Sequence, residues 1–279
     1  MTCISFQNRM LKMMPELNDD YLLEETIAIA KEAGRFLRDH VGKVRSEEIE
    51  DKDRNSLVSY VDRETEKMIV SALRELLPES TFITEEDTIE NQESEYTWII
   101  DPLDGTTNFL FNIPHFSTSI ALQHRGELVV GVVYDVSLDE CFSARKGGGA
   151  FLNGQAIKVR QAKSFQDSII ATGFPFDDAE RVEKGLNLVR HIKLHTRGMR
   201  RLGSAALDLA YVAAGRFDAY LEAGINAWDV AAGALLVQEA GGIVKDLDGN
   251  DEFLHRQQIL ASSPAVQKDV LEMSRLTFL

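Results

Sequence analysis

The sequence predicts a mixed α/β (α+β) protein with an N-terminal α+β lobe and a C-terminal α/β lobe. Two amphipathic helical patterns are followed by closely spaced β-rich segments as far as Val159. After Arg160, strands and helices alternate, which is typical of a sheet covered on both faces. With 279 residues, 44% of them apolar, the chain is long enough for two lobes. We expect a helix pair on a mostly antiparallel sheet over residues 21–162 and an α/β/α lobe over residues 163–279.

Helices open the N-terminal lobe. Apolar residues recur at helical spacing over residues 21–41 and 62–77, and Pro78 ends the second pattern. Runs of β-branched and aromatic residues then predict strands at 82–83, 96–100, 116–123, 128–134 and 141–144. Asn153-Gly154 suits a type I′ turn, so we expect a hairpin there.

Strands and helices alternate in the C-terminal lobe. The apolar β-rich runs predict strands at 168–172, 217–221, 242–246 and 259–262. Helical spacing predicts helices at 179–192, 204–214, 230–239 and 265–274.

Composition limits the classes of partner and compartment. The chain has 30 Lys plus Arg against 45 Asp plus Glu, a formal charge of −15, which opposes binding to nucleic acid or an anionic membrane. Phosphate would therefore have to be handled with bound cations. Cys3 and Cys141 are too few for a disulfide framework, so we expect a reducing cytoplasm. Residues 1–20 contain no apolar run of signal-peptide length and are expected to form a mobile, non-catalytic leader.

The most informative segment is Asp101-Pro-Leu-Asp-Gly-Thr-Thr-Asn-Phe109, which directly follows a predicted buried strand. Asp101 and Asp104 are therefore expected at a strand's carboxyl end, where ligand sites gather. Pro102 disfavours a helical Asp101, and Gly105 lets the backbone approach a ligand. Paired carboxylates suit Mg²⁺, and the free N–H groups of the next turn can bind an anion. Asp-Pro and Asp-Gly are also common turn formers, so a plain strand-to-helix turn is the alternative.

This segment resembles the first signature of the inositol monophosphatase family of magnesium-dependent, lithium-sensitive phosphomonoesterases. Residues 82–86, Phe-Ile-Thr-Glu-Glu, resemble its upstream glutamate motif, and residues 228–233 with 239–242 resemble its C-terminal signature. The motifs stand in family order, and the resemblance runs from about Leu22 to the end of the chain. It implies a layered αβαβα sandwich and a homodimer.

The resemblance also implies a site for two or three Mg²⁺ ions. The ligands implied are Glu85, Asp101, the backbone carbonyl of Leu103, Asp104 and Asp229, with Asp104 bridging two ions. Acidic runs such as 85–87 are usually solvated loops, and an acid at the position of Asp229 also stabilises a helix N-terminus. Asp62 is a candidate ligand of a third ion, but Ser59-Tyr-Val-Asp62 is equally typical of a capping box.

The mechanism implied is in-line attack of water on a phosphate monoester without a covalent intermediate. Glu85 and the Thr106 hydroxyl would position the water. The substrate-binding residues implied are Asp104, Gly105, Thr106, Arg200, Gly203, Ser204, Ala205, Glu222 and Asp229. Arg200 and its neighbour Arg201 are as readily explained as solvated surface arginines.

Three functions remain open. The leading one is hydrolysis of small polyol or sugar monophosphates, above all inositol 1- or 4-phosphate. The second keeps the chemistry but acts on fructose 1,6-bisphosphate, histidinol phosphate or 3′-phosphonucleotides. The third is a regulatory binding protein on the same fold, acting through a macromolecular partner. The complete set opposes the third function, because a pure binder has no physical need for five metal and water-handling positions, namely Glu85, Asp101, Asp104, Thr106 and Asp229.

Overall fold

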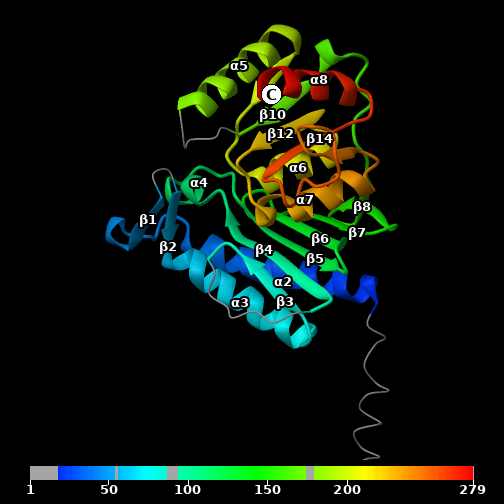
Figure 1. Cartoon of the computed structure of the whole chain (residues 1–279). Helices are drawn as coiled ribbons and strands as arrows, with labels where there is room; N and C mark the ends of the chain where they lie inside the picture. The colour runs from blue at the N-terminus through cyan, green and yellow to red at the C-terminus, as the bar shows by residue number, and fades with distance from the viewer. Residues whose placement is uncertain (1–17, 54–55, 87–93, 174–178, 279) are drawn as a thin grey trace, which may run out of the picture.

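The structure, a computed structural model, describes residues 18–53, 56–86, 94–173 and 179–278. The elements stack in the order helix pair, sheet, helix pair, sheet, helix pair, which confirms the predicted layered αβαβα sandwich (Figure 1). Most of the leader expected at residues 1–20 lies outside the described residues.

The first layer consists of α2 (Asp19–His40) and α3 (Tyr60–Leu76). Helix α2 begins two residues before the predicted start, because the Asn18 side chain accepts a hydrogen bond from the Tyr21 N–H at 2.9 Å and caps the helix. The apolar stripes of both helices pack on one face of the large sheet around the buried Trp98. These contacts form the first hydrophobic core.

The large sheet has seven strands in sequence order. They are β3 (Thr81–Thr84), β4 (Tyr96–Asp104), β5 (Ser117–His124), β6 (Glu127–Asp135), β7 (Glu140–Arg145), β8 (Gly149–Leu152) and β9 (Gln155–Ile157). Only β3 and β4 pair in parallel, so the predicted mostly antiparallel sheet is confirmed. The β8–β9 turn has positive φ at both Asn153 (48°) and Gly154 (78°), as a type I′ turn requires.

The second sheet has five strands in the order β11-β10-β12-β14-β13. They are β10 (Ile169–Thr172), β11 (Gly198–Arg200), β12 (Ala219–Ala223), β13 (Ile243–Lys245) and β14 (Gln258–Ser262). Helices α5 (Ala179–His195) and α8 (Gln267–Phe278) cover its outer face. Helices α6 (Ala205–Ala213) and α7 (Ala227–Glu239) cover the inner face, so the sheet is covered on both sides as predicted.

Helices α6 and α7 form the middle layer and share one hydrophobic core with both sheets. The chain leaves the large sheet after Ile157 and enters the smaller one at Ile169. Helices α6 and α7 pack against both sheets. The expected division into two lobes at about residue 162 remains a proposal.

A few short elements were not predicted. Strands β1 (Ile49–Asp53) and β2 (Ser56–Ser59) form an antiparallel pair, although the first is highly charged. Single-turn 3₁₀ helices lie at Ser46–Glu48 and Phe165–Asp167.

The short helix α4 (Thr106–Leu110) begins directly after Gly105, where the sequence predicts a strand-to-helix junction.

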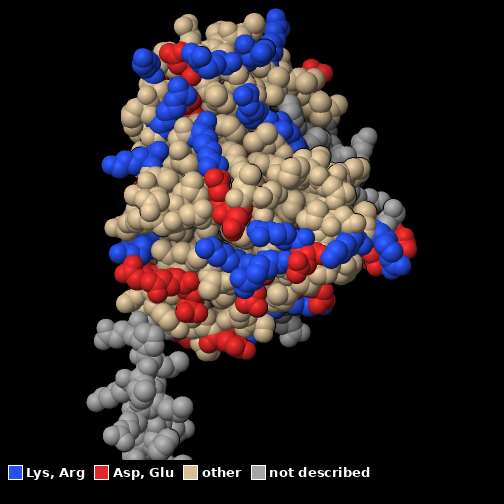
Figure 2. Space-filling view, turned by 180° about the vertical axis from the view of Figure 1, so that it is seen from behind, with Lys and Arg blue, Asp and Glu red and all other residues tan. Residues whose placement is uncertain are grey.

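Charged side chains of both signs are interspersed on the face turned away in Figure 1, including many Lys and Arg (Figure 2). The net charge of −15 is therefore not gathered into one acidic surface on this face. In the part of the chain that the structure describes, no helix combines the length and apolarity needed to cross a bilayer.

Candidate active site

A β-bulge on β4 turns Asp101 and Asp104 toward the same site. Asp101 pairs with Ser119 and Asp104 with Ser117, so three steps along β4 oppose two along β5. Residues three apart on a regular strand point to opposite faces, and the extra residue of the bulge returns the second carboxylate to the first one's side. The Asp101 carboxylate also accepts a hydrogen bond from the Leu103 N–H at 2.9 Å.

Asp229 approaches this pair from the first turn of α7. Its carboxylate accepts a hydrogen bond from the Asn226 N–H at 2.8 Å, as an acid in a helix's first turn commonly does. Carboxylate oxygens of Asp101, Asp104 and Asp229 lie within 4.8 Å of one another. The structure thus brings together three of the predicted metal ligands, from two different layers.

Burial and mutual repulsion oppose ionisation of this cluster. Desolvation, followed by the charges of neighbouring acids, raises the pKa of Asp101 and of Asp229 well above the ordinary value. Burial also raises the pKa of Asp104 to about 6, against hydrogen bonds that lower it. A divalent cation between the carboxylates would remove the repulsion, and hard oxygen donors suit Mg²⁺.

Glu85 directly follows β3 and is half-buried. Its charge raises the pKa of Asp101, Asp104 and Asp229, so it lies close enough to act on all three. The buried Glu66 accepts a hydrogen bond from the Glu86 N–H at 2.9 Å. This bond fastens the glutamate segment to α3 beside the acid cluster.

Asp104 also joins β4 to the N-terminus of α6. Its carboxylate accepts hydrogen bonds from the Ser204 hydroxyl (2.5 Å) and the N–H groups of Ala206 (2.8 Å) and Ala205 (3.3 Å). A carboxylate is favourable at a helix N-terminus, where N–H groups lack partners within the helix. The predicted Ser204 and Ala205 are therefore placed beside the acid cluster.

The Thr106 hydroxyl lies 3.0 Å from Asp62 Oδ1 and 3.0 Å from the Leu103 carbonyl oxygen, to either of which it can donate. The other Asp62 oxygen accepts hydrogen bonds from the N–H and the hydroxyl of Ser59, both at 2.8 Å. This geometry confirms the capping box of α3. Asp62 is buried, which raises its pKa, and among the described residues it is not a member of the close acid cluster.

Gly105 allows the strand-to-helix junction to pack against two other segments. Its φ is +94°, and a Cβ there would lie 3.1 Å from the carbonyl oxygens of both Gly203 and His115. The neighbouring Asn108 donates to the carbonyls of His115 (2.7 Å) and Leu202 (2.9 Å). These contacts hold the predicted Gly203 segment against the motif.

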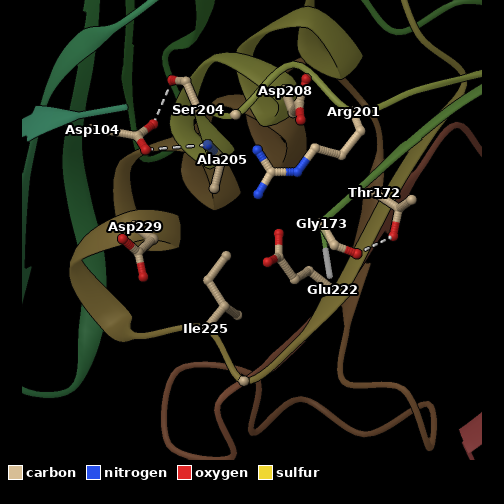
Figure 3. Close-up of a pocket in the computed structure, with 12 residues that line it drawn as sticks. Asp104, Thr172, Gly173, Arg201, Ser204, Ala205, Asp208, Glu222, Ile225 and Asp229 are labelled. Carbon is tan, nitrogen blue, oxygen red and sulfur yellow. Dashed lines mark hydrogen bonds between the residues drawn. The ribbon is translucent and has the colours of Figure 1, made fainter. Parts of the chain in front are cut away.

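A cavity of about 170 Å³ adjoins the acid cluster (Figure 3). Its lining residues are Asp104, Thr172, Gly173, Arg201, Gly203, Ser204, Ala205, Asp208, Glu222, Gly224, Ile225 and Asp229. Six predicted substrate residues are among them.

Arg201 lines the cavity in place of the predicted Arg200, and this corrects the sequence interpretation. Arg200 is exposed and donates to the carbonyl of Met199 at 2.8 Å. Successive side chains on extended backbone point in opposite directions, so only one of two adjacent arginines can face the cavity.

A profile of the inositol monophosphatase family matches residues 18–275. The chain belongs to the inositol monophosphatase family. The inositol-1-monophosphatase of Mesorhizobium japonicum is 41% identical over 252 residues, which cover 90% of this chain and 95% of that protein. The Nus factor SuhB of Pseudomonas aeruginosa is 42% identical over 255 residues, covering 90% and 94%. The crystal structure of extragenic suppressor protein suhB from Bartonella henselae matches with a TM-score of 0.87 and 38% identity, covering 91% of this chain and 98% of that one.

Within this family fold, the acid Asp208 was missed by the sequence analysis. Asp208 lies within the apolar helix α6, Ala-Ala-Leu-Asp-Leu-Ala-Tyr-Val-Ala, and is only 2% exposed. An acid within an otherwise apolar helix could have drawn attention, because carboxylates are seldom fully buried without a partner. Glu222, a predicted substrate residue, is a second acid in this cavity. Burial raises its pKa to about 7, and its carboxylate accepts a hydrogen bond from the Tyr220 hydroxyl.

Proposed function

We propose that this member of the inositol monophosphatase family is a Mg²⁺-dependent phosphomonoesterase of small polyol or sugar monophosphates. The observation that supports it best is the group of three carboxylates within 4.8 Å of one another beside a cavity of about 170 Å³. Family membership supports the reaction type, and the inositol-1-monophosphatase relative supports inositol 1- or 4-phosphate as the first substrate to test.

We propose that two or three Mg²⁺ ions bind here, since hard carboxylate oxygens are the ligands that Mg²⁺ prefers. The proposed ligands are Glu85, Asp101, the Leu103 carbonyl, Asp104 and Asp229, with Asp62 at most at the periphery, since both its oxygens already accept hydrogen bonds. Bound Mg²⁺ would lower the pKa of a coordinated water and would stabilise the negative charge on the phosphoryl oxygens.

The chain's own groups orient the reactants. We propose that Thr106 accepts a hydrogen bond from the attacking water while its own proton points to Asp62, which is fixed by Ser59. Glu85, just past the end of the parallel neighbouring strand β3, would orient the same water. The N–H groups of Gly105 and Thr106, at the start of α4, would donate to the phosphoryl oxygens. No side chain need form a covalent bond to phosphorus.

The alcohol part of the substrate would occupy the cavity next to α6. Glu222 can accept hydrogen bonds from substrate hydroxyls, and Arg201 can donate to them. Gly203, Ser204 and Ala205 line the same cavity, and the last two donate hydrogen bonds to Asp104. Fructose 1,6-bisphosphate, histidinol phosphate and 3′-phosphonucleotides remain as alternative substrates of the same chemistry.

A phosphate-release panel over these compounds tests the proposal. Activity should be absent in excess EDTA, return with Mg²⁺, and be inhibited by Ca²⁺, which is larger and prefers more ligands. Inhibition by Li⁺ is expected from the family resemblance. Full turnover in EDTA would contradict the proposed site. A homodimer, also implied by the family, would be checked by sedimentation at micromolar concentration.

The name Nus factor, given to several relatives, favours a regulatory binding protein as the second candidate. The two candidates can be separated in cells that lack the gene, complemented with Asp104→Asn. A cellular defect corrected as well by this variant as by the wild type would support a binding role. A defect corrected only by the wild type would support the phosphatase role.

A further inference from the structure

A buried carboxylate that the proposed mechanism does not use lines the cavity. Asp208 is 2% exposed, and its Oδ1 has no hydrogen-bond partner among the described residues. Burial raises its pKa well above the ordinary value, and the charges of Glu222 and Asp104 raise it further, whereas Arg201 lowers it. A carboxylate in such a place costs free energy unless a charge nearby compensates it.

Arg201 is that compensating charge. In Figure 3 its guanidinium lies between Asp208 and Glu222, across the cavity from Asp104 and Asp229. Its charge lowers the pKa of both Asp208 and Glu222, so two acids share one cation. Among the described lining residues, the charges of Arg201, Asp208 and Glu222 sum to zero when one acid is ionised and to −1 when both are.

This charge balance suits hydroxyl groups and opposes a second phosphate. Hydroxyls can donate to Glu222 and accept from Arg201 without adding charge. A second phosphate would bring about two negative charges to a guanidinium whose charge the buried Asp208 already opposes. A cavity made for a bisphosphate would be expected to leave its cation unopposed.

We propose that Asp208 is a specificity-determining residue, which neutralises Arg201 and thereby makes the cavity reject substrates that carry a second phosphate. It acts through Arg201 and not on the reacting atoms, so it is a positioning residue. This inference rests on the proposed function and deepens it, since it removes bisphosphates from the substrate class.

Fructose 1-phosphate and fructose 1,6-bisphosphate form a matched pair of substrates for the test, because they differ only in the second phosphate. With Mg²⁺, kcat/KM would be measured for both with the wild type, Asp208→Asn and Arg201→Gln. Asp208→Asn should raise the bisphosphate-to-monophosphate ratio about tenfold, the order expected for one charge near a phosphate. Arg201→Gln should lower the same ratio.

Asp135→Asn is the matched control. Asp135 is also buried, but it lies on β6 and accepts a hydrogen bond from the Tyr211 hydroxyl at 3.3 Å. Its substitution should lower stability without changing the substrate ratio. If Asp208→Asn does not fold, Asp208→Ser serves for the same measurement.

The outcomes separate the two proposals. A wild-type enzyme that hydrolyses both fructose phosphates equally well would leave the phosphatase function standing and overturn the role of Asp208. Equal losses on both substrates in Asp208→Asn, or an unchanged ratio, would also overturn it, because that behaviour belongs to a structural residue. If no phosphomonoester in the panel is hydrolysed with Mg²⁺, the proposed function fails, and the inference fails with it.

Discussion

Asp101 and Asp104 lie three residues apart on one strand, yet their carboxylates reach the same cluster. The bulge that pairs them with Ser119 and Ser117 supplies the extra residue that makes this possible. The backbone of β4 therefore fixes where a cation would bind, and Asp229 from α7 and Glu85 after β3 would complete the proposed site.

Asp104→Asn should lower turnover by on the order of 10²-fold or more, because it removes a charge from the proposed bridging ligand. In chelator its thermal midpoint should equal or exceed that of the wild type, since repulsion within the cluster falls. Turnover with Mg²⁺ and the thermal midpoint in EDTA check both statements. Normal turnover together with lower stability in EDTA would show that Asp104 only supports the turn.

Asp62→Asn should act on both stability and rate. Loss of the charged cap of α3 should cost roughly 0.5–2 kcal/mol of unfolding free energy. Turnover should also fall, because the amide keeps only one acceptor oxygen and cannot serve both Ser59 and Thr106 as the carboxylate of Asp62 does. Denaturant unfolding and initial rates would be measured on the same preparation. A stable variant with only its rate reduced would contradict the capping role.

Thr106→Val should lower kcat by about 10²-fold or more with little change of fold, because the hydroxyl that positions water is lost while the side-chain volume is kept. Thr106→Ser is the matched control, since it retains the hydroxyl and should keep most of the activity. Equal losses in the two variants would point to packing of the methyl group as the cause.

Gly105→Ala should destabilise the protein by more than Gly126→Ala. Both glycines have positive φ, at +94° and +85°, which an alanine adopts at a cost of about 1 kcal/mol. A Cβ at residue 105 would also lie 3.1 Å from two carbonyl oxygens, whereas one at residue 126 would meet nothing within 4 Å. Urea unfolding should show the difference. Equal losses would mean that the junction adapts without cost.

Stability of the metal-free protein should fall as the pH rises from about 4 to above 6. The pKa of Asp104 is about 6 in the folded state against 3.8 as the ordinary value, so the folded protein binds more protons than the unfolded chain over this range. The stability contribution is complete below pH 3.8 and lost above pH 6, and its size is roughly 3 kcal/mol.

Thermal midpoints in EDTA across this range would measure the loss, and Asp104→Asn should flatten the curve. Added Mg²⁺ should restore stability above pH 6, because it binds the ionised carboxylates. A metal-free midpoint that rises from pH 4 to pH 7 would contradict the raised pKa.

The sequence by itself determined the order of the elements and the pair of acids. Helical periodicity located α2 and α3, and local turn chemistry located the hairpin at Asn153-Gly154, because both signals depend only on neighbouring residues. The same local chemistry marked Asp101 and Asp104. The sequence did not predict short or charged strands such as β1 and β11, because their formation depends on a partner strand more than on their own residues.

Only the tertiary structure decided which side chains share the cavity. Ser204 and Ala206 donate to Asp104 across about a hundred residues of sequence, and no local pattern could reveal that contact. The choice of Arg201 over Arg200 depended on which face of an extended segment the packing turned inward. Asp208 became a candidate only when its burial and its missing partner were visible, because desolvation belongs to the packed layers and not to the residue itself.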